Sequence, residues 1–406
     1  MSSMKVCLLA PEFLPNRGGV GTYSVDLSRE LGRMVDLTVV TLTREDSAHH
    51  YTVPEMEAAV GGAARVLPIS VARDCFVYNF GFQTAVLRRL PRLLRGEGFE
   101  VLHSQHAHMP DLLLRPLLGG MPTVRTIHTT ITGQQEAIRM AQRFGGSLEA
   151  SERWQIALQL GLRAAERFLL TRPDQAITVS HWMRERLVHD GFPAERLHVV
   201  YNGVDSHRFA PGPHDFSGGT DGGEGPTVFF PGRPTLVKGG EIFAQAAPRI
   251  LARVPNARFV FAGGSVADLE RLLAGTHLPP GHVRLLGFVP YEELAHVYAG
   301  MDVVVAPTFY ENLPFRVLEA MACRSAVVAS DVCGIPEAIT SGQNGWLVPA
   351  GDPQALADAV SSLLLDGSLR ARLGAAARHT VEERFTWAAA AESTVAAYGS
   401  AIGAAS

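Results

Sequence analysis

The sequence predicts an α/β protein with two halves, each built on a parallel β-sheet. Along its 406 residues short apolar runs alternate with segments of helical periodicity, a pattern typical of parallel sheets covered by helices. The length alone corresponds to about two to three domains. Residues 211–226 contain Gly, Pro and Asp and almost nothing apolar, which indicates a linker or exposed loop. We therefore expect a domain over 1–208, a linker over 209–225 and a second domain over 226–385, with a C-terminal helix over 386–406.

Each half contains a run of expected strands that end in polar loops. In the first half a helix is expected over 25–34 and a long helical stretch from about 134 to 170, and the strands cover 5–10, 35–42, 99–108, 123–130, 175–180 and 197–205. The stretches 44–82 and 131–150 are interpreted as acceptor loops. In the second half strands and helices alternate from TVFFPG (227–232) to AVVAS (326–330), and helices follow from 352, with 380–402 helical throughout.

Composition excludes several classes of function. A net charge of −4 argues against a nucleic-acid-binding protein. No apolar run reaches the roughly 18 residues of a membrane span, and MSSMKVCLLA is too short for a secretion signal. The four cysteines lack metal-like spacing, and Cys7 and Cys323 lie in apolar stretches, which favours a reducing, cytoplasmic location. LRRLPRLLR (87–95) leaves two interpretations open: a surface helix, or peripheral contact with the inner membrane face.

Two glutamates, Glu311 and Glu319, bracket the segment ENLPFRVLE after the apolar run VVVAPT (303–308). Pro314 suits the first turn of a helix, where its missing N–H costs nothing. Glu311 is then expected on the preceding loop and Glu319 about one and a half turns inside the helix. Ligands of open α/β sheets bind at such strand–loop–helix junctions. This segment therefore predicts a binding site for a hydroxyl-rich, phosphate-bearing molecule.

A second candidate segment, PGRPTLVKGG, carries Arg233 and Lys238 between an expected strand and helix. The chain has only two lysines, Lys5 and Lys238, against 34 arginines, so a lysine here is conspicuous. Two cations five residues apart suit a diphosphate leaving group, because both can neutralise its developing charge. The alternative is a pair of solvated cations.

Glycines and histidines mark the expected strand ends of the first half. Gly18 and Gly19 belong to GGVG, either a ligand loop or a tight turn. The second strand ends in TLTRED without an acid at its tip, so a nicotinamide cofactor is not expected. HSQHAH (103–108) fits no common zinc spacing, and no D-x-D is present, so we expect neither metal nor cofactor. His128 ends another expected strand. We expect it to contact a ligand, and a purely structural role is the alternative.

Together these motifs resemble the retaining glycosyltransferases of family 4, with the GT-B fold. The similarity runs nearly end to end and includes Gly18, Gly19, Ser180, YNGVD (201–205), GRPTLVKGG, LLGFVPYEEL (285–294), ENLPFRVLEAMAC, GIPE (334–337), NGWLV (344–348) and RFTW (384–387). The resemblance implies two Rossmann-like domains facing each other across a deep cleft, with the C-terminal helix crossing back to the first domain.

The resemblance also implies roles for individual residues. Arg233 and Lys238 would clamp the donor diphosphate, Glu311 would contact the sugar, Glu319 the ribose, and His128 the reacting sugar. Further donor contacts are implied for Gly18, Gly19, Gly287, Phe288, Val289, Asn312, Leu313, Pro314, Phe315 and Arg316. Acceptor contacts are expected at His106, His108 and Ser180.

The expected function is metal-independent transfer of a hexose, with retention, from a nucleotide-diphosphate sugar to a glycan, lipid-linked or small-molecule acceptor. UDP- and GDP-sugars are the favoured donors. Two alternatives stay open: a nucleotide-sugar epimerase or sugar phosphorylase on the same fold, and a non-catalytic sugar-nucleotide-binding protein. Two residues depart from the family pattern. Arg316 stands where relatives have a small residue, and Arg324 stands where a glycine commonly ends the helix.

Overall fold

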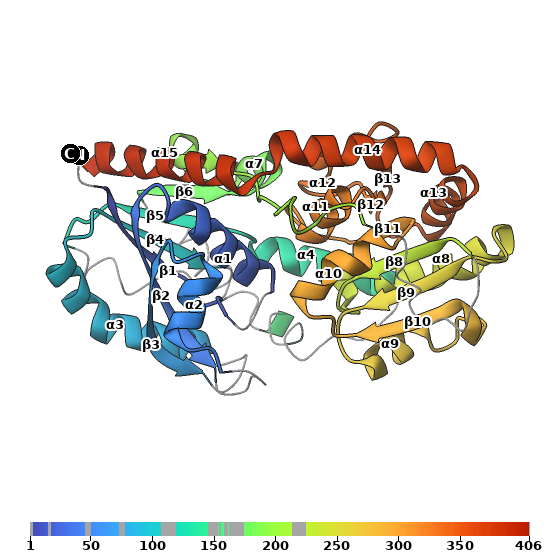
Figure 1. Cartoon of the computed structure of the whole chain (residues 1–406), viewed down its shortest axis with the longest axis horizontal. Coiled ribbons are helices and arrows are strands. Elements are labelled where there is room, and N and C mark those ends of the chain that lie inside the picture. Colours follow the sequence, from blue (N-terminus) through green and yellow to red (C-terminus); the bar gives the residue numbers. More distant parts are fainter. Residues whose placement is uncertain are drawn as a thin grey trace. The chain divides into compact units, whose positions relative to one another are not determined.

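Two all-parallel sheets organise the chain in the computed structural model (Figure 1). The structure describes residues 3–14, 18–44, 50–72, 78–106, 119–144, 153, 156–157, 161, 174–212 and 225–405. The chain divides into two compact units. The first comprises Met1–Ile131, Leu160–Gly203 and Trp387–Ser406, and the second comprises Thr132–Gln159 and Val204–Thr386. The segment Thr132–Gln159 thus belongs to the second unit, although it lies inside the range 1–208 of the sequence-based division.

The first unit contains a seven-stranded sheet in the order β3-β2-β1-β4-β5-β6-β7. Its strands are β1 (Lys5–Leu9), β2 (Asp36–Arg44), β3 (Arg65–Ala72), β4 (Val101–His106), β5 (Thr123–Ile127), β6 (Gln175–Thr178) and β7 (Leu197–Val199). The accompanying helices are α1 (Gly19–Leu31), α2 (Val53–Ala59), α3 (Tyr78–Glu97), α7 (His181–His189) and α15 (Trp387–Ala405). The order reverses between β1 and β4, which makes their carboxyl ends a topological switch point.

The second unit contains a six-stranded sheet in the order β10-β9-β8-β11-β12-β13. Its strands are β8 (Thr227–Pro231), β9 (Arg258–Ala262), β10 (Val283–Gly287), β11 (Val303–Ala306), β12 (Ala326–Ser330) and β13 (Trp346–Val348). Its helices are α4 (Ile131–Ala141), α8 (Gly240–Arg253), α9 (Val266–Leu273), α10 (Tyr291–Ala299), α11 (Phe315–Ala322), α12 (Ile335–Ala338), α13 (Pro353–Leu365) and α14 (Gly367–Arg384). The switch point here lies between β8 and β11, which pair directly through Val303 and Val228.

The expected fold class is confirmed, but several expected elements of the first unit are wrong. The loop predicted around GGVG is largely helix, because α1 begins at Gly19 and leaves only Gly18 as its N-cap. All residues from Gly21 to Ser28 are buried, including Thr22, Ser24 and Asp26. These buried polar residues interrupt the apolar pattern of the helix, so periodicity missed its first turns.

The stretch 44–82, expected to be a loop, contains β3 and α2. β3 lies at the edge of the sheet and pairs only with β2, with an irregularity between Thr41 and Leu42. Its pattern RVLPISVA contains a proline and alternates poorly, which is tolerated at an edge. α2 carries a capping box formed by Thr52 and Glu55.

The helical stretch expected from 134 to 170 begins earlier, as α4 at Ile131, and α4 ends at Ala141. The C-terminal segment expected to be one helix is two, because α14 ends at Arg384 and α15 begins at Trp387. Phe385 at the break is fully buried, and its carbonyl accepts a hydrogen bond from the Val204 amide. α15 then packs on α1, β5 and β6 of the first unit, as expected for the C-terminal helix.

No described helix is long and apolar enough to cross a membrane. The arginine-rich segment 87–95 forms the second half of α3, in which Val86 and Leu90 are buried, while Arg88, Arg89, Arg92 and Arg95 are exposed. The cysteines Cys7 and Cys323 are free and buried. Burial raises the pKa of both thiols to about 12, so neither is a reactive thiolate.

Candidate active site

The second unit brings Lys238, Glu311 and Arg316 together at its topological switch point. Lys238 ends a short 3₁₀ turn, Leu236–Lys238, in the loop after β8. Glu311 lies in the loop after β11, and Arg316 is the second residue of α11. The carboxyl ends of adjacent strands at a switch point splay their loops apart, which is where open α/β sheets bind ligands.

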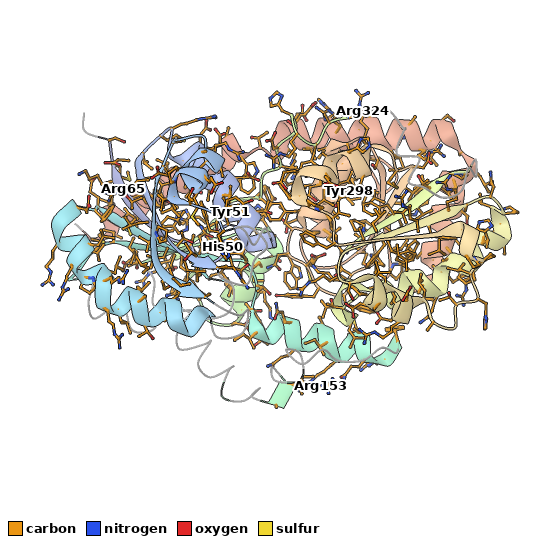
Figure 2. The ribbon with its side chains drawn as sticks, turned by 60° about the horizontal axis from the view of Figure 1, so that its bottom comes forward. His50, Tyr51, Arg65, Arg153, Tyr298 and Arg324 are labelled. Carbon is orange, nitrogen blue, oxygen red and sulfur yellow. The ribbon has the colours of Figure 1, made fainter. Side chains whose placement is uncertain are left out.

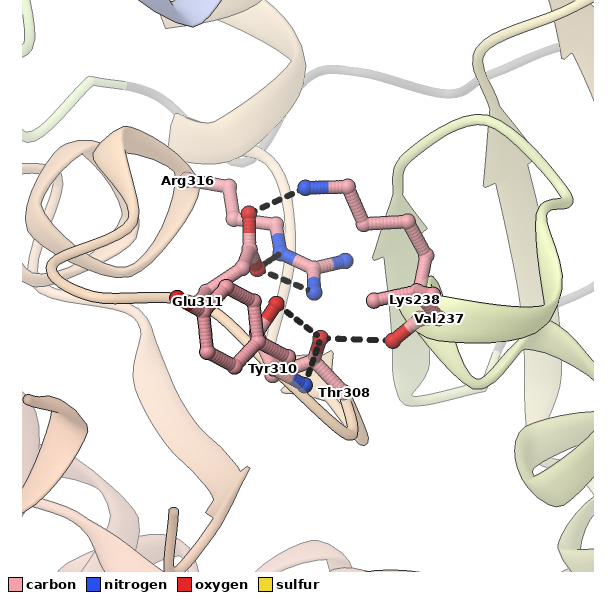
Figure 3. Close-up of polar contacts among 6 residues, drawn as sticks. All are labelled: Val237, Lys238, Thr308, Tyr310, Glu311 and Arg316. Atoms are coloured by element: carbon pink, nitrogen blue, oxygen red, sulfur yellow. Dashed lines mark hydrogen bonds and ion pairs between the residues drawn. The ribbon is translucent and has the colours of Figure 1, made fainter. Parts of the chain in front are cut away.

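Glu311 is the centre of this cluster (Figure 3). Lys238 Nζ contacts its Oε1, while Arg316 Nε and Nη2 both donate to its Oε2, at 3.0 and 2.6 Å. The Arg316 guanidinium also lies over the Phe230 ring, 6.0 Å from its centroid. Arg316, one of the two departures from the family pattern, thus points onto Glu311.

Opposing effects set the ionisation of the cluster. Burial favours a neutral Glu311, but Arg316 and Lys238 outweigh it and lower the pKa of that carboxyl. Burial lowers the pKa of Lys238, Glu311 raises it in part, and the positive charges of Arg316 and Arg233 lower it further. Two cations therefore contact one carboxylate, and Arg233 adds positive charge near Lys238; this excess of positive charge suits an anionic ligand.

The loops that carry Lys238 and Glu311 are tied together by backbone contacts. Val237 O accepts from Thr308 Oγ1 at 2.7 Å and from the Phe309 amide at 2.8 Å. Gly239, with φ of 72°, lies so close that a β-carbon there would be 1.8 Å from Pro307 O. Thr308 was not singled out from the sequence, although it follows β11 and Pro307 in this loop.

Glu319 lies on α11 and is 5% exposed. Its Oε2 accepts a hydrogen bond of 3.1 Å from Tyr298, a buried residue of α10 (Figure 2). Burial and the neighbouring Glu319 charge raise the pKa of Tyr298 well above its ordinary value, so the phenol stays protonated and donates. Sequence reasoning missed Tyr298 because nothing in VYAG distinguishes it from a core aromatic residue.

The other predicted donor contacts of the second unit lie on the loops after β8, β10 and β11 and at the start of α11. Arg233 is exposed in the loop after β8. Asn312, Leu313 and Pro314 are buried before α11, and Phe315 begins it, so Pro314 is the N-cap rather than the first-turn residue expected. Gly287 ends β10 with φ of 66°, and its carbonyl accepts from the Gly263 amide at 2.7 Å. After it, Phe288 is 80% exposed and Val289 half-buried.

In the first unit, the predicted residue His128 lies just after β5, beside residues of β4 and α1. His128 Nε2 contacts Gln105 Oε1 at 2.9 Å, and the Tyr23 ring packs edge-on against His128 with centroids 4.5 Å apart. Because an amide oxygen only accepts, His128 carries its proton on Nε2. Gln105, the residue between two histidines in HSQHAH, was not singled out from the sequence.

His103 extends this group into the interior. Its Nδ1 meets Tyr398 Oη at 2.7 Å, and its Nε2 meets Thr126 Oγ1 at 2.8 Å. Burial, with a smaller contribution from His128, lowers the pKa of His103 to about 3, so the ring is neutral. His103 is therefore a structural residue that fastens α15 to the sheet.

The remaining predicted residues have the following positions. Ser180 is buried and caps α7, accepting from the Met183 amide at 3.1 Å. Gly18 and Gly19 are exposed at the start of α1. His106 ends β4, where it pairs with Ile127, but its side chain and all of His108 lie outside the described part of the chain. Within that part, no three His, Cys, Asp or Glu residues are grouped to hold a metal ion.

Comparisons with known families match both units. The family described as "Glycosyltransferase Family 4" matches residues 17–208, and "Glycosyl transferases group 1" matches residues 217–380. An alpha-maltose-1-phosphate synthase of Mycolicibacterium smegmatis is 31% identical over 97% of this chain and 99% of its own length. A D-inositol 3-phosphate glycosyltransferase of Corynebacterium diphtheriae is 28% identical over 99% of this chain and 96% of its own.

Solved structures share the fold. A sucrose-phosphate synthase from Thermosynechococcus elongatus superposes with a TM-score of 0.79 at 20% identity, covering 98% of both chains. The Anabaena protein HepE, solved with UDP-glucose, superposes with a TM-score of 0.72 at 18% identity, covering 97% of this chain and 98% of its own. Two parallel-sheet α/β units of this kind constitute a GT-B fold.

Proposed function

Because the chain belongs to glycosyltransferase family 4 and is a transferase that uses a nucleotide-sugar donor, we propose that it moves a hexose from a nucleotide-diphosphate sugar to an acceptor hydroxyl with retention of configuration. The observation that carries this proposal is the Lys238–Glu311–Arg316 cluster at the switch point of the second sheet. A diphosphate leaving group needs cations placed in advance, and Lys238 and Arg233 lie on one loop at that point.

The chemistry of the leaving group supports transfer without a metal ion. Lys238 and Arg233 supply positive charge where a divalent cation would otherwise neutralise the diphosphate. Glu311 is engaged through both oxygens, which favours a role in holding the sugar over a role as nucleophile. Under this proposal the departing phosphate assists deprotonation of the acceptor on the same face of the sugar.

UDP- and GDP-sugars are the proposed donors. HepE was solved in complex with UDP-glucose, which supports a uridine nucleotide. The acceptor is proposed to be a glycan, a lipid-linked molecule or a small molecule. Relatives named for inositol phosphate and phosphatidyl-myo-inositol support a phosphorylated or lipid-linked polyol among these. We place the reaction in the cytoplasm, with the exposed arginines of α3 as the part that would meet an anionic membrane surface.

A melting screen tests the donor assignment. The full chain is heated with UDP-, GDP-, ADP- and dTDP-sugars, each with and without EDTA. We expect one nucleotide to raise the melting temperature, because a ligand that binds only the folded state stabilises it in proportion to the logarithm of its concentration over Kd. EDTA should leave that shift unchanged, and the anomer of the product, read by NMR, should match that of the donor. No shift with any nucleotide would contradict the proposal.

A further inference from the structure

Arg316 is the least exposed member of the site cluster. Its side chain is 8% accessible, against 16% for Glu311 and 29% for Lys238. It holds Glu311 Oε2 through two hydrogen bonds, while Lys238 contacts only Oε1. The two cations thus bind different oxygens of one carboxylate, and only Lys238 has substantial access to solvent.

This difference matters when a diphosphate arrives. To bind a phosphate, Lys238 must turn away from Glu311, and a largely buried carboxylate that loses its only cation is strongly destabilised. Lysine is a point charge on a flexible stem and can turn, whereas the planar guanidinium of Arg316 fits one geometry. Because Arg316 keeps two hydrogen bonds to Oε2, Glu311 stays paired after Lys238 has left.

The third nitrogen of Arg316 shows that the side chain acts through Glu311. Nη1 is buried and has no hydrogen-bond partner among the described residues. It lies beside Gly232, where a β-carbon would be 3.0 Å away. An enclosed nitrogen cannot reach a ligand, so the contribution of Arg316 passes through the carboxylate it holds.

Building on the proposed function, we propose that Arg316 is a positioning residue for donor binding: it is the permanent counter-ion of Glu311 and thereby frees Lys238 for the donor diphosphate. Without Arg316, Lys238 would stay paired with Glu311, and the donor phosphate would bind it weakly.

A double-mutant cycle tests this role. Binding of UDP, GDP, ADP and dTDP is measured by calorimetry for the wild type, Arg316→Met, Glu311→Gln and the double variant. In the wild-type background we expect Arg316→Met to weaken binding about tenfold, a coupling within the range for contacting residues. In the Glu311→Gln background, where no carboxylate retains Lys238, the same change should alter binding by less than about twofold.

Other outcomes are equally informative. Equal weakening in both backgrounds would mean that Arg316 contacts the diphosphate directly, and no weakening in either would mean that it plays no part; both overturn the proposal. Arg316→Lys restores a cation for Glu311 and should recover most of the binding at a wild-type melting temperature. If this variant folds and binds as weakly as Arg316→Met, the counter-ion role is wrong. A wild type that binds none of the four nucleotides would instead overturn the proposed function, and the role of Arg316 with it.

Discussion

At the scale of single residues, the two arginines that depart from the family pattern have opposite physical consequences. Arg316 is absorbed into the site through Glu311. Arg324 directly follows Cys323, the C-cap of α11, with φ of 62°, in the left-handed region where glycine is favoured, and its side chain is exposed (Figure 2). The turn is fixed by α14, because a β-carbon on Gly374 would lie 2.1 Å from Arg324 O. The chain thus keeps the turn without its usual glycine, at the expense of backbone strain.

Replacing Arg324 by glycine should therefore stabilise the second unit. A left-handed conformation costs an L-residue about 1–2 kcal/mol, and glycine removes this cost. Glycine also makes the unfolded chain more flexible, which offsets part of the gain. We expect a net gain of about 0.5–1 kcal/mol in the free energy of unfolding, measured by denaturant titration. Arg372→Gly is the matched control, since this exposed arginine lies inside α14 and the change should cost about 1 kcal/mol. Destabilisation by both changes would show that the strain at Arg324 is not relieved by glycine.

Lys238 is the residue whose loss should affect the reaction most directly. Alanine at this position removes a cation placed in advance for the leaving group, and we expect the transfer rate to fall by about 10² or more. The chain's other lysine, Lys5, is exposed at the start of β1, and Lys5→Ala should leave the rate unchanged. A rate near that of the wild type for Lys238→Ala, measured as nucleotide release with the donor found in the melting screen, would remove Lys238 from the mechanism.

At the scale of elements, the site depends on the close approach of the loops after β8 and β11. The two hydrogen bonds to Val237 O and the contact between Gly239 and Pro307 bring Lys238 within reach of Glu311. Lys238 ends a single 3₁₀ turn and Glu311 lies in a loop, so their positions depend on how the two loops pack. Position 239 requires glycine twice over, for its positive φ and for the missing side chain.

Comparing Gly239→Ala with Gly275→Ala should separate the cost of the positive φ from the cost of the steric clash. Gly275 also has a positive φ, of 85°, but a β-carbon there meets nothing within 4 Å. Gly275→Ala should cost about 1–2 kcal/mol of strain alone. Gly239→Ala adds a clash with Pro307 O, so calorimetric melting should show a clearly larger loss, accompanied by weaker nucleotide binding. Equal losses for the two variants would mean that the loop moves aside without cost.

At the scale of the whole molecule, the chain passes between the two units more than once, and its last segment, Trp387–Ser406, belongs to the first unit. α15 follows the second unit in sequence but packs on α1, β5 and β6. Its Tyr398 is fully buried against His103, and Trp387 at its start packs against Tyr23 with ring centroids 5.6 Å apart. Stability of the first unit therefore depends on residues at both ends of the sequence.

His103 should make that stability depend on pH. Its pKa falls from 6.5 to about 3 on folding, so between these values the unfolded chain binds a proton that the folded chain excludes. The free energy of unfolding must then rise with pH across that window, by up to about 1.4 kcal/mol per unit. His103→Asn should flatten the profile measured by calorimetry from pH 4 to pH 7. His379→Asn, a change to a histidine that is 70% exposed, should not. An unchanged slope in His103→Asn would assign the pH dependence elsewhere.

The sequence predicted the second unit better than the first for a physical reason. The strands β8, β9, β11 and β12 are short runs that are buried almost throughout, so each appears as an uninterrupted apolar stretch. In the first unit, β3 lies at the edge of the sheet, and many of the residues that α1 buries are small or polar. Such elements are specified by their neighbours and carry little local signal.

The site divides in the same way. Residue type and spacing were enough to single out Glu311, Glu319, Arg233 and Lys238, because carboxylates and cations on the loops of a parallel sheet have few structural reasons to be there. The chain by itself also determined the fold class and the family. Only the tertiary structure decided that Arg316 pairs with Glu311, that Tyr298 donates to Glu319 and that His103 is a structural residue. Those contacts join residues from separate elements or depend on a side-chain direction, and packing, not sequence spacing, fixes both.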